Sequence, residues 1–157
     1  MTTMASPVLN ASDRRLLEAA RTATLATIDE RGRPRLVPCC FALDPDAPRI
    51  WTPIDAKPKR SADPHRLGRV ADLTARPRVS LLVERWSEDW SELAWLRLHG
   101  QGTLLEAGEP GAAEERRAAI GALRARYAQY RDHDLEARPI IAIDVTEALR
   151  WAASNRG

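Results

Sequence analysis

Six short segments rich in apolar and β-branched residues constrain this fold more than any other feature of the sequence. In residues 22–28, TATLATI, apolar and polar positions alternate with the period of a half-buried strand. A turn around Gly32 then predicts a hairpin with residues 34–43 as its return strand. Pro38 cannot donate a hydrogen bond to a neighbouring strand, so it indicates a bulge or an edge position. The predicted strands are residues 22–28, 34–43, 49–53, 79–84, 93–105 and 139–145, the first three forming an antiparallel meander.

Three further segments have the spacing of amphipathic helices. Ser12 precedes a helix pattern over residues 13–21, and residues 65–75 and 110–130 repeat apolar residues every three or four positions. In the last of these, Tyr127 is expected on the apolar face and Arg126 on the face toward water. Paired glycines at 100 and 102 predict a sharp bend in the fifth strand. Together these elements predict an α+β fold, a six-stranded antiparallel barrel, closed or split, with flanking helices.

The length and charge of the chain limit its organisation and its partners. With 157 residues, the sequence predicts a single domain over residues 11–152, after a disordered N-terminus of residues 1–10. A net charge of +2 at pH 7, with basic and acidic residues interspersed, does not indicate a nucleic-acid-binding protein. No apolar run approaches the roughly 20 residues that cross a bilayer, and residues 1–9 lack the apolar core of a signal peptide. We therefore expect a cytoplasmic protein.

The stretch from Lys57 to Val83 is the strongest candidate for a binding site. It begins with a loop that carries the two lysines of the sequence, Lys57 and Lys59, continues through a basic helix pattern, and ends in an apolar strand pattern. Backbone N–H groups and basic side chains can converge on a phosphate in such a unit. Chance clustering of two lysines on a solvated loop is the alternative interpretation.

Cysteine and histidine do not predict a metal site. Cys39 and Cys40 are adjacent, so on a strand they point to opposite faces, and neither a disulfide nor zinc ligation is expected. The three histidines, His65, His99 and His133, do not have the spacing of metal ligands and are given no role.

Four segments together resemble the pyridoxamine 5′-phosphate oxidase-like split-barrel superfamily. In order, they are ATLATIDERGRPRLVPCCFALD at 23–44, WTPI at 51–54, RVADLTARPRVSLLVE at 69–84 and LRLHGQGTLL at 96–105. Within this superfamily, EDWSELAWLRLHG at 88–100 and the KPK loop look most like the actinobacterial branch of probable oxidoreductases that use the deazaflavin coenzyme F420. The resemblance implies an FMN-binding split-barrel fold and a homodimer that holds its cofactor in a groove between subunits.

The resemblance also implies a set of cofactor-binding positions. Arg69 matches the basic position that binds the cofactor phosphate, while Asp72 stands where the family commonly has Asn. The KPK loop supplies candidates for the phosphate or for an acidic cofactor tail, and strand positions match those that line the ring plane. The full set of implied cofactor-binding residues is Lys57, Lys59, Arg69, Val37, Pro38, Cys39, Thr52 and Pro53. Arg69 and Arg66 could instead be solvated helix residues, and Pro38 and Thr52 could serve only to shape the sheet edge.

The function implied is that of an F420-dependent oxidoreductase, which transfers a hydride between the deazaflavin and a small organic substrate. Two alternatives share the same groove: an FMN-binding flavoprotein of the pyridoxamine phosphate oxidase type, and a non-catalytic protein that binds a cofactor, haem or another tetrapyrrole. Trp86, Trp90 and Trp95 are expected in the core or at the subunit contact rather than stacked on a cofactor ring. The sequence nominates no catalytic residue.

Overall fold

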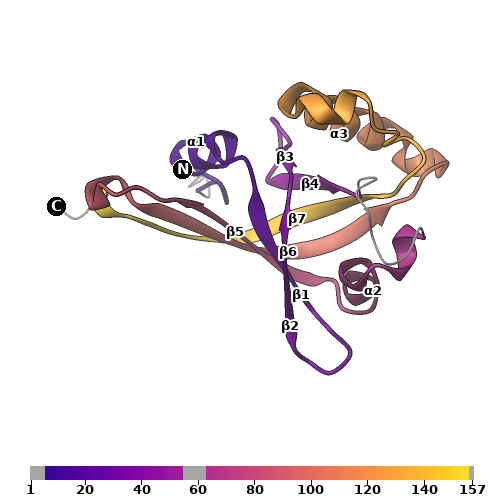
Figure 1. Cartoon of the computed structure of the whole chain (residues 1–157), viewed down its shortest axis with the longest axis horizontal. Coiled ribbons are helices and arrows are strands. Elements are labelled where there is room, and N and C mark those ends of the chain that lie inside the picture. The colour runs from indigo at the N-terminus through magenta and orange to yellow at the C-terminus, as the bar shows by residue number, and fades with distance from the viewer. Residues whose placement is uncertain (1–5, 55–62, 156–157) are drawn as a thin grey trace, which may run out of the picture.

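One curled antiparallel sheet organises the computed structural model, which describes residues 6–54 and 63–155 (Figure 1). Over these residues the sheet has seven strands in the order β2-β1-β5-β6-β7-β4-β3. It curls into a half-barrel, which confirms the predicted α+β class, although the predicted count of six strands is wrong. The strands are β1 (Ala23–Ile28), β2 (Pro34–Cys39), β3 (Ala42–Leu43), β4 (Arg49–Pro53), β5 (Arg78–Arg85), β6 (Ala94–Leu105) and β7 (Ile140–Ala152).

The extra strand arises because the predicted strand over residues 34–43 is broken after Cys39. β2 pairs with β1 at one edge of the sheet, whereas β3 pairs with β4 at the other edge, so the predicted meander is also wrong. At the break, Phe41 is fully buried, and its backbone N–H donates to the hydroxyl of Tyr127 at 3.0 Å. The Tyr127 hydroxyl thus takes the place of a strand partner for a buried backbone group.

Three α-helices cover the sheet: α1 (Ala11–Ala19), α2 (Gly68–Ala75) and α3 (Ala113–Arg126). Short 3₁₀ turns lie at Pro64–Arg66, Trp90–Glu92, Pro110–Ala112, Ala128–Arg131 and Ala153–Asn155. Asn10, rather than Ser12, caps α1, because its side chain accepts from the N–H of Asp13 at 2.8 Å. Leu9, within the segment expected to be disordered, is only 3% exposed.

The arginine at the end of α3 does not face water as predicted. Arg126 donates to the carbonyl oxygens of Leu17 and Glu18 at 2.9 and 3.1 Å, and its guanidinium lies 4.8 Å from the centre of the Phe41 ring. A cation at the carboxyl end of α1 is also favoured by the helix dipole. Arg126 therefore ties α3 to α1.

Two apolar cores lie on opposite faces of the sheet. The larger core packs α1 and α2 against β1, β5, β6 and β7, and includes Leu17, Leu73 and Leu98. The smaller core packs α3 against β4 and β7, and includes Trp51 and Tyr127. Within the described residues, no helix combines the length and the apolar character needed to cross a membrane.

Gly100 explains the bend that was predicted in the fifth strand, β6. The pairing of β6 with β7 shifts register between His99 and Gly100. A Cβ atom on Gly100 would lie 2.2 Å from the carbonyl oxygen of Asp144, whereas a Cβ on Gly102 would lie 3.4 Å from the nearest atom, Cγ1 of Val79. The close approach of β7 therefore requires glycine at 100 but not at 102.

Candidate functional site

Three of the predicted cofactor-binding residues come together from three different elements. Arg69 lies in the first turn of α2, Cys39 is the last residue of β2, and Thr52 lies in β4. Burial raises the pKa of the Cys39 thiol to about 11, and the nearby Thr52 hydroxyl and Arg69 charge oppose this rise only in part. The three side chains therefore share one partly buried environment.

Two polar atoms in this group are buried without a hydrogen-bonding partner. They are Nε of Arg69 and Oγ1 of Thr52, for which the residues that the structure describes supply no hydrogen bond. Leaving such a group unsatisfied costs about 1–3 kcal/mol, and the neighbouring thiol of Cys39 is only a weak hydrogen-bonding group. A ligand that offers an anionic or carbonyl oxygen to Arg69 and Thr52 would recover that free energy. The site thus fits an acidic group such as a phosphate.

The strands place the remaining predicted residues on two different faces. Val37 and Cys39 pack against the larger core, and Thr52 lies on the same face of β4 as Ile50, which belongs to that core. Side chains alternate along a strand, so Pro38 and Pro53 point to the opposite faces of β2 and β4. Cys39 and Thr52 are therefore brought together with Arg69, and Val37 lies on the same face of β2 as Cys39, whereas Pro38 and Pro53 point to the other face.

Arg35 neutralises the acidic residue next to this group. The carboxylate of Asp72, on α2, accepts from Nε of Arg35 at 2.7 Å and from the hydroxyl of Thr27 at 2.8 Å. Arg35 also lies against the start of α2, since a Cβ on Gly68 would be 2.6 Å from Cζ of Arg35. Asp72 is thus a buried carboxylate whose ion-pair partner, Arg35, is 42% exposed. Sequence patterns did not single out Arg35, although it lies two residues before Val37 and so on the same face of β2.

The other predicted basic residues, Lys57 and Lys59, lie outside the described residues, in the range 55–62. Their contribution to the site stays a prediction. Ile54, which precedes this range, is fully buried, and Asp63, which follows it, caps the 3₁₀ turn that leads into α2. The range therefore connects β4 with the helix that carries Arg69.

The three histidines contact different partners. Nδ1 of His99 lies 2.6 Å from the hydroxyl of Ser80, its neighbour across β5 and β6. Hydrogen bonds that the His65 ring donates to the carboxylates of Glu106 and Asp63 raise the pKa of His65. Over residues 6–54 and 63–155, no three His, Cys, Asp or Glu side chains gather as a metal site would require.

The sequence of residues 9–152, which contains the whole sheet and its three α-helices, matches the family described as Pyridoxamine 5′-phosphate oxidase. This chain belongs to the pyridoxamine 5′-phosphate oxidase family. No curated protein matches the sequence. Membership in the pyridoxamine 5′-phosphate oxidase family agrees with the split barrel described above, while the actinobacterial F420 branch stays a prediction.

Solved structures show how far the fold is shared. The conserved hypothetical protein Rv2991 from Mycobacterium tuberculosis is 20% identical, with a TM-score of 0.70 over 98% of this chain and 91% of that one. The FAD-binding protein mll6688 from Mesorhizobium loti is 19% identical, with a TM-score of 0.65 over 90% and 94% of the two chains. HutZ, the heme storage protein from Vibrio cholerae, is 14% identical, with a TM-score of 0.63 over 92% and 94%. The fold of the pyridoxamine 5′-phosphate oxidase family is therefore shared by proteins with different ligands.

Proposed function

We propose that this chain binds a phosphate-bearing redox cofactor of the flavin type and transfers a hydride between that cofactor and a small organic substrate. Coenzyme F420 is the cofactor we favour, because the KPK loop suits a long acidic tail, and FMN is the alternative. The observation that carries the proposal is the pair of buried, unpartnered polar atoms on Arg69 and Thr52. The FAD-binding relative from M. loti and the family itself support a flavin-type ligand.

Each residue of the site has a definite part in binding. Arg69 donates a charge-assisted hydrogen bond to an acidic oxygen, and Thr52 supplies a hydroxyl beside it. Val37, on the same face, adds an apolar wall that keeps water from the site. A flavin or deazaflavin supplies the hydride chemistry when bound, and the protein positions it and excludes solvent. Because the cofactor supplies the hydride chemistry, the protein does not need a catalytic acid, base or nucleophile, and the sequence predicts none.

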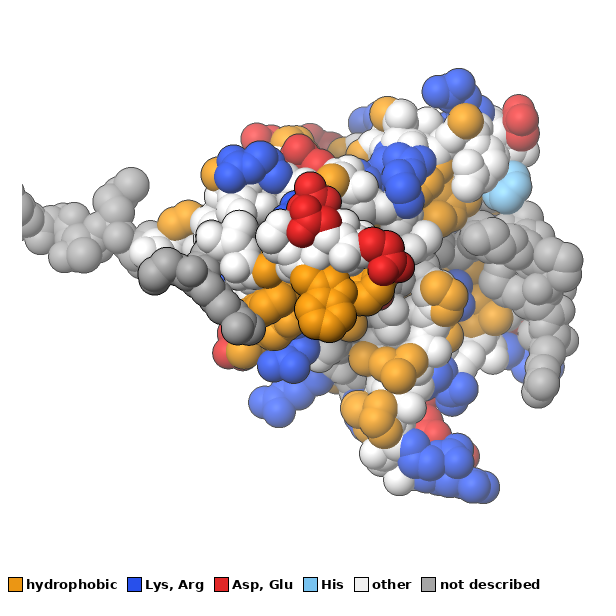
Figure 2. Space-filling view, turned by 60° about the vertical axis from the view of Figure 1, so that its left-hand side comes forward, with side chains coloured by type: hydrophobic (Ala, Val, Ile, Leu, Met, Phe, Trp, Pro, Cys, Tyr) orange, Lys and Arg blue, Asp and Glu red, His pale blue; other side chains and the backbone are white. Residues whose placement is uncertain are grey.

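We further propose that the protein is a homodimer that pairs through the outer face of the sheet. Leu36 on β2 and Leu82 on β5 share this face and are 66% and 38% exposed. Trp86 and Trp90, which follow β5, are 67% and 71% exposed, so they do not belong to the core of one subunit. Figure 2 shows exposed hydrophobic side chains gathered on one side of the molecule, with acidic groups above them and basic groups below. A second copy would cover this surface, and a two-fold axis that runs across it between the acidic and the basic groups would place unlike charges opposite each other.

Binding is tested by titrating the protein with F420, FMN and haemin at one fixed salt concentration. We expect F420 to bind most tightly, with a shift or quenching of its fluorescence. We expect Arg69→Gln and Lys57→Ala each to weaken binding by about 1–3 kcal/mol, which is roughly 5- to 150-fold. Arg117→Gln, an exposed arginine on α3, is the matched control and should bind normally.

The outcomes separate the candidate functions. If FMN binds more tightly than F420 and the protein is yellow, FMN is the cofactor. If only haemin binds tightly, a haem-binding role is favoured, as the name of HutZ, a heme storage protein, suggests for that protein. Unchanged affinity in both variants would reject the proposed anchor. Turnover of reduced F420 with a panel of unsaturated acceptors then tests hydride transfer, and light scattering of the wild type and of Leu82→Asp tests the dimer.

A further inference from the structure

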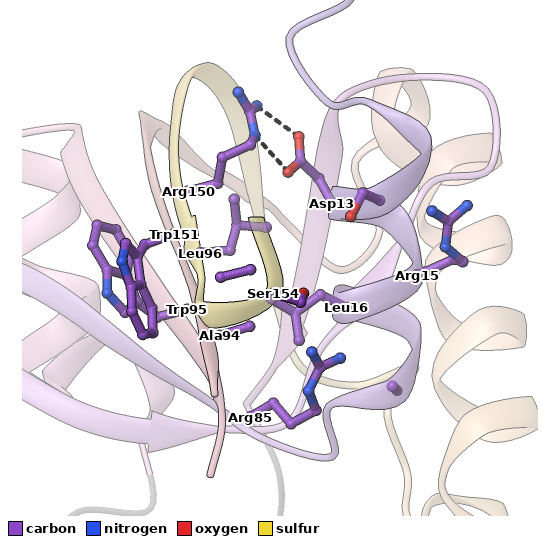
Figure 3. A pocket seen from close by; sticks show the side chains of 13 residues that line it. Asp13, Arg15, Leu16, Arg85, Ala94, Trp95, Leu96, Arg150, Trp151 and Ser154 are labelled. Carbon is purple, nitrogen blue, oxygen red and sulfur yellow. Dashed lines mark hydrogen bonds and ion pairs between the residues drawn. The ribbon is translucent and has the colours of Figure 1, made fainter. Parts of the chain in front are cut away.

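A cavity of about 500 Å³ lies between α1 and the extended ends of β6 and β7 (Figure 3). This volume is within the range of small-molecule sites in proteins, roughly 300–1,000 Å³. None of the residues of the candidate cofactor site lines this cavity. Three arginines do line it, Arg15, Arg85 and Arg150. In Figure 3, Arg150 and Arg85 lie at opposite ends of the cavity, and Leu16 lies between them.

One of these arginines is already neutralised. Nε and Nη2 of Arg150 donate to the two carboxylate oxygens of Asp13, each at 2.7 Å. Asp13 is 4% exposed, and one of its oxygens also accepts from the backbone N–H of Asn10 at 2.9 Å. Asp13 therefore takes part in the capping box of α1 and pairs with Arg150, and its single negative charge is compensated by that arginine.

The other two arginines keep most of their donors free. Nε of Arg85 donates to the backbone carbonyl of Glu92 at 2.6 Å, and its two Nη atoms have no partner among the described residues. Arg15 has no hydrogen bond or ion pair within the described part of the chain. Asp13 is the one acidic residue that lines the cavity, so its walls carry an excess of two positive charges. This excess favours an anion.

The floor of the cavity, in contrast, is apolar. It is formed by Leu16 and Ala19 of α1 and by Ala94 and Leu96 of β6, with the hydroxyl of Ser154 at one side (Figure 3). A floor of this kind binds the hydrocarbon part of a ligand, since burying apolar surface contributes about 25 cal/mol per Å². We propose that this cavity is a second ligand site, which takes an amphiphilic organic anion with a phosphate or carboxylate head at Arg85 and Arg15 and an apolar body against Leu16 and Leu96.

The experiment is isothermal titration of the full-length protein with octyl phosphate, octanoate, 1-octanol and inorganic phosphate at one salt concentration. We expect octyl phosphate or octanoate to bind at least about tenfold more tightly than 1-octanol and inorganic phosphate, because only they combine head and body. The ratio of the affinities for octyl phosphate and octanoate distinguishes a phosphate ester from a carboxylate as the ligand. Binding should persist when F420 or FMN is present at saturation.

Single substitutions in the cavity test where the octyl ligands bind. Arg85→Gln and Arg15→Gln should each weaken octyl phosphate binding about tenfold, and Ala19→Leu, which fills part of the floor, should weaken all the octyl ligands. Arg117→Gln and Arg69→Gln should bind octyl phosphate as the wild type does. Binding in the cavity is therefore tested independently of cofactor binding at Arg69. The proposal would be overturned if Arg85→Gln and Arg15→Gln both bound octyl phosphate as tightly as the wild type. Loss of octyl phosphate binding in Arg69→Gln, or no binding of either octyl phosphate or octanoate to the wild type, would also overturn it.

Discussion

Replacing Gly100 by alanine should destabilise the protein far more than the same change at Gly102. The Cβ atom at 100 would lie 2.2 Å from the carbonyl oxygen of Asp144, which is backbone of β7 and cannot rotate away. Strands β6 and β7 would have to separate locally, which combines an overpacking cost of about 1–3 kcal/mol with weakening of one or two ladder hydrogen bonds of about 1 kcal/mol each. We expect Gly100→Ala to lower the free energy of unfolding by about 3 kcal/mol.

Gly102→Ala is the matched control in the same strand. Its Cβ would make an ordinary contact at 3.4 Å with Cγ1 of Val79, a side-chain atom. Removing the backbone freedom of glycine from the unfolded chain stabilises by about 0.4–1 kcal/mol where the residue fits. Urea unfolding of the wild type and both variants, followed by circular dichroism, measures the difference. Two variants within about 0.5 kcal/mol of each other, or a larger loss at 102, would refute the steric explanation.

Three further predictions follow from the buried polar groups. Arg35→Met should lower the free energy of unfolding in urea by about 1–3 kcal/mol, which is less than for a fully buried ion pair because Arg35 is 42% exposed. The same change in an Asp72→Asn background should cost much less, and equal costs in the two backgrounds would show that the two side chains are not coupled. The pKa of Cys39 is raised from 9.0 to about 11, so the unfolding free energy should fall as pH rises from about 9 to about 11, by at most about 3 kcal/mol. Cys39→Ala should remove this loss and Cys40→Ala should keep it, and identical slopes in the two variants would contradict the assignment. Tyr127→Phe should lower the thermal midpoint and cost about 1–3 kcal/mol, because a buried backbone N–H loses its acceptor; an unchanged midpoint would show that water replaces the hydroxyl.

The positions of most helices and strands could be predicted from the sequence, because they depend on patterns that span only a few residues. Alternation of apolar residues located β1, and short apolar, β-branched runs between turn signals located β4, β5 and β6. The turn around Gly32 is confirmed by its positive φ of 77°. The apolar stripe of the longest helix is likewise confirmed, since Ile120, Leu123 and Tyr127 are all buried. Local backbone geometry fixes these features wherever the segment ends up in the fold.

The pairing of distant segments was decided only in the tertiary structure. Sequence patterns did not reveal that the chain crosses from one sheet edge to the other at Cys40, or that β4 pairs with β7. They named Cys39, Thr52 and Arg69 separately, but only the curled sheet brings these residues together and leaves two of their polar atoms buried without partners. The reason is physical: which strands pair depends on how all the apolar faces can be buried at once, and that choice is made by contacts between residues far apart in the chain.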